Sequence, residues 1–164
     1  MIARSKIALT IIAGILATLP AGAVTAKSLD AKAFTGTWKL DLAKSKFSSA
    51  KYTPKGDTRT YSVAGDHITM HSDMVTGAGK PMKWSYSARS DGKSYPVSGN
   101  TGADHIMITL SGPREFRSQT MLKGKPASKS SMTASADGKQ LRIIRNLSTP
   151  EGATNDTIVY DRVK

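Results

Sequence analysis

Hydrophobic and polar residues alternate along most of the chain from Thr35 onward, which is the pattern of half-buried β-strands. The clearest run is 82–89, where Met, Trp, Tyr and Ala alternate with Lys, Ser, Ser and Arg. Turn signals such as Gly65-Asp66 and Asp137-Gly138 separate the runs at short, regular spacing. The pattern predicts strands at 35–41, 57–64, 67–74, 82–89, 93–97, 105–110, 115–122, 128–135, 140–147 and 155–163.

Consecutive strands with one hydrophobic face and short connections bury that face by closing into a barrel or by stacking as a sandwich. Connections this short favour an up-and-down meander, which closes more simply into a barrel. We expect one or two helical turns at 42–47 and a short tail at 27–34. The predicted fold class is therefore all-β: a single antiparallel up-and-down β-barrel of eight to ten strands, formed by residues 33–164.

The first 26 residues resemble an export signal, and we do not expect them to belong to the fold. Arg4 and Lys6 precede an apolar run of 13 residues, and Pro20 and several small residues follow it. The run is too short for a membrane-spanning helix, which needs about 20 apolar residues. We therefore expect a secretory signal peptide at 1–26, its removal near Ala26, and a periplasmic or secreted protein that does not span the membrane.

Composition limits the chemistry and indicates the partners. The 164 residues contain no Cys, which excludes disulfides, a thiol nucleophile and thiolate metal ligands. The net charge is +12, and a cationic exported protein is attracted to anionic envelope surfaces. The expected location argues against nucleic acid as a partner. The lysines are scattered singly, however, and this pattern favours an ordinary solvated surface over a specific anionic partner.

Candidate catalytic and metal-binding groups are sparse. His67 and His71 would lie about 13 Å apart along one strand, too far to share a metal ion, and His105 is remote in sequence. The chain has no Gly-x-Ser-x-Gly elbow and no phosphate-binding loop, and most Asp residues fall in turns. We predict no catalytic residue, no metal and no cofactor, and the sequence favours a protein that is not an enzyme.

The segment Gly36-Thr37-Trp38-Lys39-Leu40 resembles the Gly-x-Trp opening of the lipocalins and fatty-acid-binding proteins, the calycin barrels. The stretch 34–164 also resembles small exported bacterial lipocalin-like proteins of unassigned function, through this opening and the segments 43–47 and 95–100. The resemblance implies that Gly36 lets the chain turn into the barrel and that Trp38 plugs one end. It also implies an Arg from the last strands over the Trp38 ring, for which Arg162 is the candidate.

The chain departs from the fatty-acid-binding proteins at two features of that family. Their Arg-x-Tyr pair on the last strand corresponds to Ile158 and Tyr160, so the Tyr is kept and the Arg is lost. Their helical lid between the first two strands has no counterpart of similar length in residues 42–56. Tight fatty-acid binding in their manner is therefore not expected.

Strand register places Arg145 on the same face as Leu141, Ile143 and Leu147. If that face points inward, Arg145 needs a carboxylate, backbone carbonyls, water or a ligand anion as partner, and with Tyr160 it could hold an acidic head group. Alternatively, a bulge or the strand end lets Arg145 reach solvent. The residues expected to face a ligand are Met70, Trp84, Tyr86, Ile108, Phe116, Ile143, Arg145 and Tyr160.

Two functions fit the sequence. The first is an exported, non-catalytic, monomeric binding protein that holds a small apolar or amphipathic ligand inside the barrel. The second is an envelope interaction protein whose basic exterior binds anionic surfaces while its core is filled. The volume of the interior distinguishes them, because pockets for drug-sized ligands measure about 300–1,000 Å³.

Overall fold

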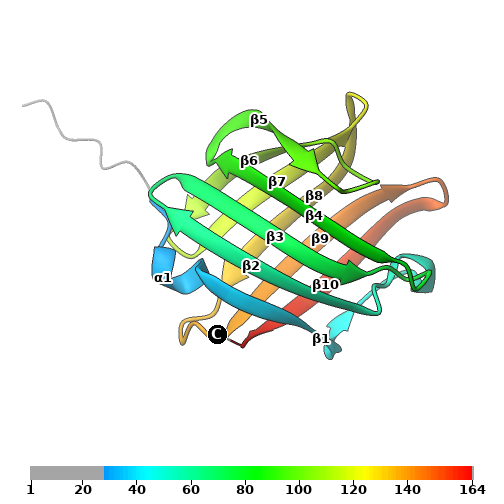
Figure 1. The fold of residues 1–164 in the computed structure, drawn as a ribbon, viewed down its shortest axis with the longest axis horizontal. Helices are drawn as coiled ribbons and strands as arrows, with labels where there is room; N and C mark the ends of the chain where they lie inside the picture. Colours follow the sequence, from blue (N-terminus) through cyan, green and yellow to red (C-terminus); the bar gives the residue numbers. More distant parts are fainter. Residues whose placement is uncertain (1–27, 164) are drawn as a thin grey trace, which may run out of the picture.

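Ten antiparallel strands make up most of residues 28–163, the part of the chain that the computed structural model describes (Figure 1). Each strand pairs with the next one, and the last pairs with the first, so the sheet closes into a barrel and the predicted fold class is confirmed. The expected leader, residues 1–26, lies outside the described residues. The strands are β1 (Gly36–Lys46), β2 (Gly56–Ala64), β3 (His67–Val75), β4 (Pro81–Arg89), β5 (Asp91–Ser98), β6 (His105–Gly112), β7 (Glu115–Leu122), β8 (Lys125–Ala134), β9 (Gln140–Thr149) and β10 (Gly152–Arg162).

Two expectations near the start of the barrel are wrong. Residues 42–46 are not helical; they continue β1 through an irregularity in its pairing with β10, between Asp41 and Lys46. Helical structure follows instead in the short 3₁₀ turn Ala50–Tyr52. The expected tail at 27–34 contains the helix α1 (Ala31–Phe34), whose first turn is capped by the Asp30 carboxylate.

Helix α1 closes one end of the barrel (Figure 1). Phe34 is fully buried there and packs against Phe116, with ring centroids 5.4 Å apart. The Trp38 indole is also fully buried, and its Nε1–H donates to the Phe34 carbonyl at 2.8 Å. The Arg162 guanidinium lies over the Trp38 ring, 4.1 Å from its centroid. This cation–π stack gives the sealed end the arrangement that the calycin resemblance implies.

Inward-facing side chains fill only the half of the barrel next to α1. The fully buried Ile68, Met70, Ile108, Leu141 and Tyr160 form a packed layer above Phe34 and Trp38. In each of their strands, the residues toward the other end are less completely buried. The barrel is therefore solid at the α1 end and hollow toward the opposite end.

The barrel wall is weakest between β4 and β5, where only Ser85↔Ser98 and Tyr86↔Val97 are paired within the described chain. Gly99 follows this junction with a positive φ of 76°, and its backbone presses against the Lys83 carbonyl. Only Gly fits at this position, because a Cβ would lie 2.1 Å from that oxygen. In residues 28–163, no helix is long and apolar enough to span a membrane.

Candidate ligand cavity

A cavity of about 740 Å³ occupies the half of the barrel opposite α1. Its rim is formed by the connections between β1 and β2, β3 and β4, β5 and β6, β7 and β8, and β9 and β10, which gather at the right of Figure 1. The short β1–β2 connection contributes Tyr52 and Pro54 to this rim, and its helical structure is the single 3₁₀ turn Ala50–Tyr52. The volume lies within the range of pockets that hold drug-sized ligands.

The cavity has a floor and two chemically different walls. Tyr61, Tyr86, Phe116 and Ile143 belong to the floor, directly above the packed layer. Strands β3 and β4 supply an apolar wall of Met74, Met82 and Trp84. Across the barrel, β7 and β8 supply a wall of hydroxyl groups from Ser118, Thr120, Ser128 and Ser130. Such a lining suits a molecule with one apolar side and one side that hydrogen-bonds.

A buried ion pair lies at the floor. The Arg59 Nε–H donates to Asp57 Oδ2 at 2.8 Å, and the two side chains are only 10% and 0% exposed. Asp57 also accepts hydrogen bonds of 2.7 Å from the Ser72 and Tyr160 hydroxyls. The Arg59 guanidinium lies 4.8 Å from the Tyr160 ring centroid and 5.4 Å from that of Trp84. Arg59 thus lines the cavity while its guanidinium is held by the fully hydrogen-bonded Asp57 carboxylate and lies beside two aromatic rings.

Burial and neighbouring charges shift the pKa values of Tyr160 and Arg59 upward. Burial raises the pKa of the Tyr160 hydroxyl well above its usual value, the Arg59 charge opposes that rise, and Asp57 adds to it. Burial by itself lowers the pKa of Arg59, but Asp57 and the phenolic oxygens of Tyr160 and Tyr61 hold it well above its usual value. At neutral pH, Arg59 is therefore a cation and Tyr160 keeps its hydroxyl proton.

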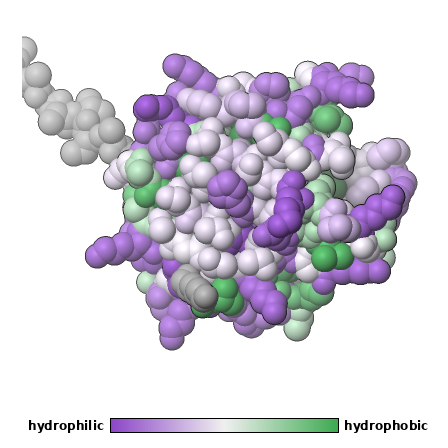
Figure 2. All heavy atoms as spheres, viewed as in Figure 1, coloured by the Kyte–Doolittle hydropathy of each residue, from purple (hydrophilic) through white to green (hydrophobic). Residues whose placement is uncertain are grey.

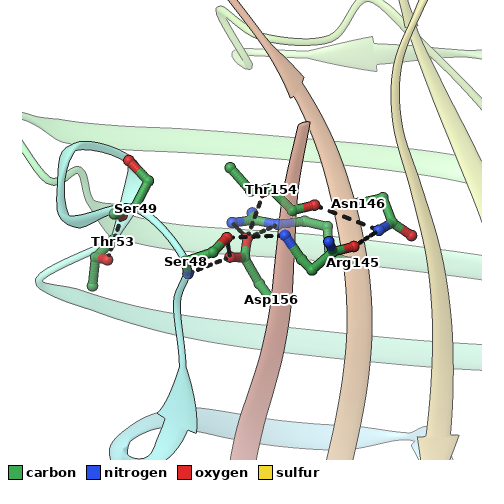
Figure 3. Close-up of polar contacts among 8 residues, drawn as sticks. Ser48, Ser49, Thr53, Arg145, Asn146, Thr154 and Asp156 are labelled. Atoms are coloured by element: carbon green, nitrogen blue, oxygen red, sulfur yellow. Dashed lines mark hydrogen bonds and ion pairs between the residues drawn. The ribbon is translucent and has the colours of Figure 1, made fainter. Parts of the chain in front are cut away.

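A second ion pair lies higher on the wall (Figure 3). Arg145 points into the barrel, and its Nη2–H and Nε–H donate to Asp156 Oδ2 at 2.7 and 3.1 Å. The other carboxylate oxygen of Asp156 accepts from the backbone and side chain of Ser48, which fastens the β1–β2 connection to the wall. Burial opposes ionisation, yet the Ser48 N–H and the Arg145 guanidinium lower the pKa of Asp156.

Five of the eight residues predicted to face a ligand line the cavity: Trp84, Tyr86, Phe116, Ile143 and Arg145. The other three, Met70, Ile108 and Tyr160, lie in the packed layer beneath the floor. Arg145 and Tyr160 do not meet, because Arg145 is opposite Asp156 on β10 while Tyr160 is opposite Leu141 on β9. Of the partners considered for Arg145, the structure shows the carboxylate. Gly36, Trp38 and Arg162 lie at the sealed end.

Sequence reasoning missed the Asp57–Arg59 pair. The signal was present, because Asp57 and Arg59 alternate in step with Tyr61 and Val63, and the two hydrophobic residues fix which face of β2 is buried. Asp156 was missed in the same way, since it shares a face with Ile158 and Tyr160 on β10. Of the charged residues at inward register positions, only Arg145 was predicted from the sequence.

Comparison with known proteins shows the fold alone. No family model matches the chain, and no curated protein matches it. Among solved structures, the zebrafish ileal bile acid-binding protein complexed with cholic acid is similar, with a TM-score of 0.52 and 12% identity, over 80% of this chain and 99% of that one. EF1p2_mFAP2b bound to DFHBI is also similar, with a TM-score of 0.43 and 12% identity, over 80% of this chain and 95% of that one. The chain is therefore a closed ten-strand antiparallel barrel whose fold is similar to that of the zebrafish ileal bile acid-binding protein.

Proposed function

We propose that this protein binds one small amphipathic molecule in the open half of its barrel and performs no chemical step on it. The observation that carries the proposal is the cavity of about 740 Å³, with its apolar β3–β4 wall and its hydroxyl-bearing β7–β8 wall. A barrel that served only as a scaffold would gain stability by filling this volume with side chains, because protein interiors are otherwise close-packed. The zebrafish ileal bile acid-binding protein, which has a similar fold, holds cholic acid in its complex, and this agrees with such a use of the barrel.

The test uses Nile red, a neutral dye that fluoresces strongly in apolar surroundings. The dye should bind the wild-type protein at one site and should be displaced by small amphipathic molecules. Thr120→Trp places a bulky ring inside the cavity and should weaken dye binding at least about tenfold by excluding volume. Native mass spectrometry of the protein purified from its own cells would reveal the natural ligand.

Gln119→Trp is the matched control, because Gln119 precedes Thr120 on β7 and is not among the residues that line the cavity. Its dye affinity should equal that of the wild type. Equal binding by all three proteins would place the dye on the outer surface and refute the proposal.

The site of action that we propose is the periplasm or the cell exterior, after removal of the leader. The basic start, the apolar run of 13 residues and the small residues before Ser28 support this location. Intact-mass measurement on protein expressed in bacteria tests it. A mature chain that begins close to Lys27 supports export, and a chain that retains residues 1–26 contradicts it.

A second candidate function is binding of an anionic surface through the rim. Lys55, Lys80 and Lys123 are exposed on the rim connections and Lys125 is exposed at the start of β8, and none of the four forms an ion pair within the described residues. Figure 2 shows hydrophilic side chains spread over the visible face, with hydrophobic residues in small separate groups. Attraction to acidic lipid head groups would bring the open end of the cavity toward a membrane surface.

A further inference from the structure

Arg59 presents more hydrogen-bond donors to the cavity floor than the protein satisfies. Its side chain lines the cavity although the residue is only 8% exposed. The Nε–H is taken by Asp57, and the two Nη groups carry four further N–H bonds. The Tyr61 hydroxyl lies beside the guanidinium, but neither Nη group donates a well-formed hydrogen bond to any residue of 28–163.

The Trp84 indole packs beside these donors but does not offer its own N–H to the cavity. Its Nε1–H is inaccessible and has no acceptor in the part of the chain described. The Arg59 Nη–H groups at the cavity floor have no well-formed protein acceptor, so a ligand group that accepts hydrogen bonds is favoured at this point.

The charge of the floor is already balanced. Three donors, from Arg59, Ser72 and Tyr160, converge on the two oxygens of Asp57, which makes it an acceptor-only, ionised carboxylate. Arg59 and Asp57 therefore form a neutral pair. The higher pair of Arg145 and Asp156 is neutral as well, so the two inward arginines bring no uncompensated positive charge.

From this balance we infer that the cavity floor selects a neutral oxygen acceptor, such as a ketone or amide carbonyl, over a carboxylate of the same size. The inference rests on the proposed function and adds the chemical class of the buried end of the ligand. A carbonyl oxygen accepts the free Nη–H groups and adds no charge. A carboxylate at the same place would be the second anion beside one buried cation. Its attraction to Arg59 would not offset the free-energy cost of removing the carboxylate from water.

The test compares 2-dodecanone with dodecanoate as competitors of Nile red, at about pH 8. About 0.5 M NaCl is included because it screens the exposed rim lysines, which could otherwise hold a carboxylate at the mouth. The wild type should bind the ketone at least about tenfold more tightly. Tighter or equal binding of dodecanoate overturns the inference. The proposed function still stands in that case, provided that the protein binds the dye and that Thr120→Trp weakens this binding.

Asp57→Asn sharpens the test because it leaves the charge of Arg59 uncompensated without changing the shape of the side chain. The preference for the ketone should fall at least about tenfold or reverse. Asp73→Asn removes the same charge from the outer surface of β3 and should change nothing. No shift in Asp57→Asn, or a shift in Asp156→Asn instead, would place the ligand head group away from Arg59 and overturn the inference.

The melting temperature of each variant shows whether it folds. If Asp57→Asn does not fold, the inference is still tested by the relative affinities of the two competitors for the wild type and for Asp156→Asn. A protein that binds neither competitor nor the dye refutes the proposed function, and that outcome differs from all those above.

Discussion

Replacement of Arg162 by Met tests what seals the barrel. The guanidinium stacks on Trp38 at 4.1 Å and donates to the carbonyls of Gly138 at 2.6 Å and Ala33 at 2.9 Å. It also reaches the carbonyls of Thr35 and Lys32, which are more exposed. One side chain therefore joins β10, helix α1 and the β8–β9 turn.

The expected cost follows from these contacts. The two partly buried hydrogen bonds contribute about 1–1.5 kcal/mol each, and the exposed ones contribute little because water replaces them. The cation–π stack adds about 0.5–2 kcal/mol. Arg162→Met should lower the free energy of unfolding by about 3–4 kcal/mol, and Arg162→Lys by roughly half as much, because an ammonium keeps the charge and loses the planar fork.

Urea unfolding, followed by circular dichroism and by fluorescence, measures the effect. The transition midpoint should fall while its urea dependence stays the same, since the surface exposed on unfolding does not change. Arg117→Met is the control: the Arg117 side chain is 70% exposed, and its loss should cost less than about 0.5 kcal/mol. If Arg162→Met were as stable as the control, the stack and the carbonyl contacts would not hold the sealed end.

Further predictions concern the wall, the junction and the rim. Asp156→Asn should cost about 2–3 kcal/mol, because Arg145 and the β1–β2 connection lose a charged partner. Asp156 has a lowered pKa, so its contribution is complete above its ordinary pKa of 3.8 and is lost as the pH falls through the folded value; acid titration of stability should be shallower in the variant. Gly99→Ala should cost about 2–3 kcal/mol through its positive φ and the Lys83 carbonyl, and an unchanged melting temperature would contradict the geometry. Binding to anionic vesicles, if it occurs through the rim, should weaken steeply between low and physiological salt, and binding that ignores salt would remove the rim hypothesis.

The strands could be predicted because period-two alternation is a local property of the sequence. The same rule failed at 42–46, where β1 continues through an irregularity in its pairing with β10 and its mostly exposed residues lose the alternation. It also failed at 31–34, since a four-residue helix has no period of its own and is held by tertiary contacts with Phe116 and Arg162. Those contacts join distant parts of the chain.

The site was predictable only in part. Register alone placed Trp84, Tyr86 and Arg145 on the inner face. The depth of each residue depends on where the barrel is filled, and no local pattern gives that; Met70 and Tyr160 are inward but lie below the cavity. The partner of Arg145 follows from strand pairing across the closed sheet, which fixes Asp156 opposite Arg145, whereas Asp57 lies two residues before Arg59 on the same face of β2.

The seam between β1 and β10 has a consequence for folding and misfolding. Until β10 docks, β9 and β1 each present a row of unpaired backbone groups, and exposed strand edges template association between chains. The seam joins strands from opposite ends of the barrel sequence, so its formation closes the longest loop in the fold and has the largest loss of chain entropy. Such long-range pairing makes folding slow. Without β10 the closed barrel becomes an open sheet whose two edge strands, β1 and β9, can pair with other chains. Proteolytic loss of this strand should therefore be accompanied by aggregation.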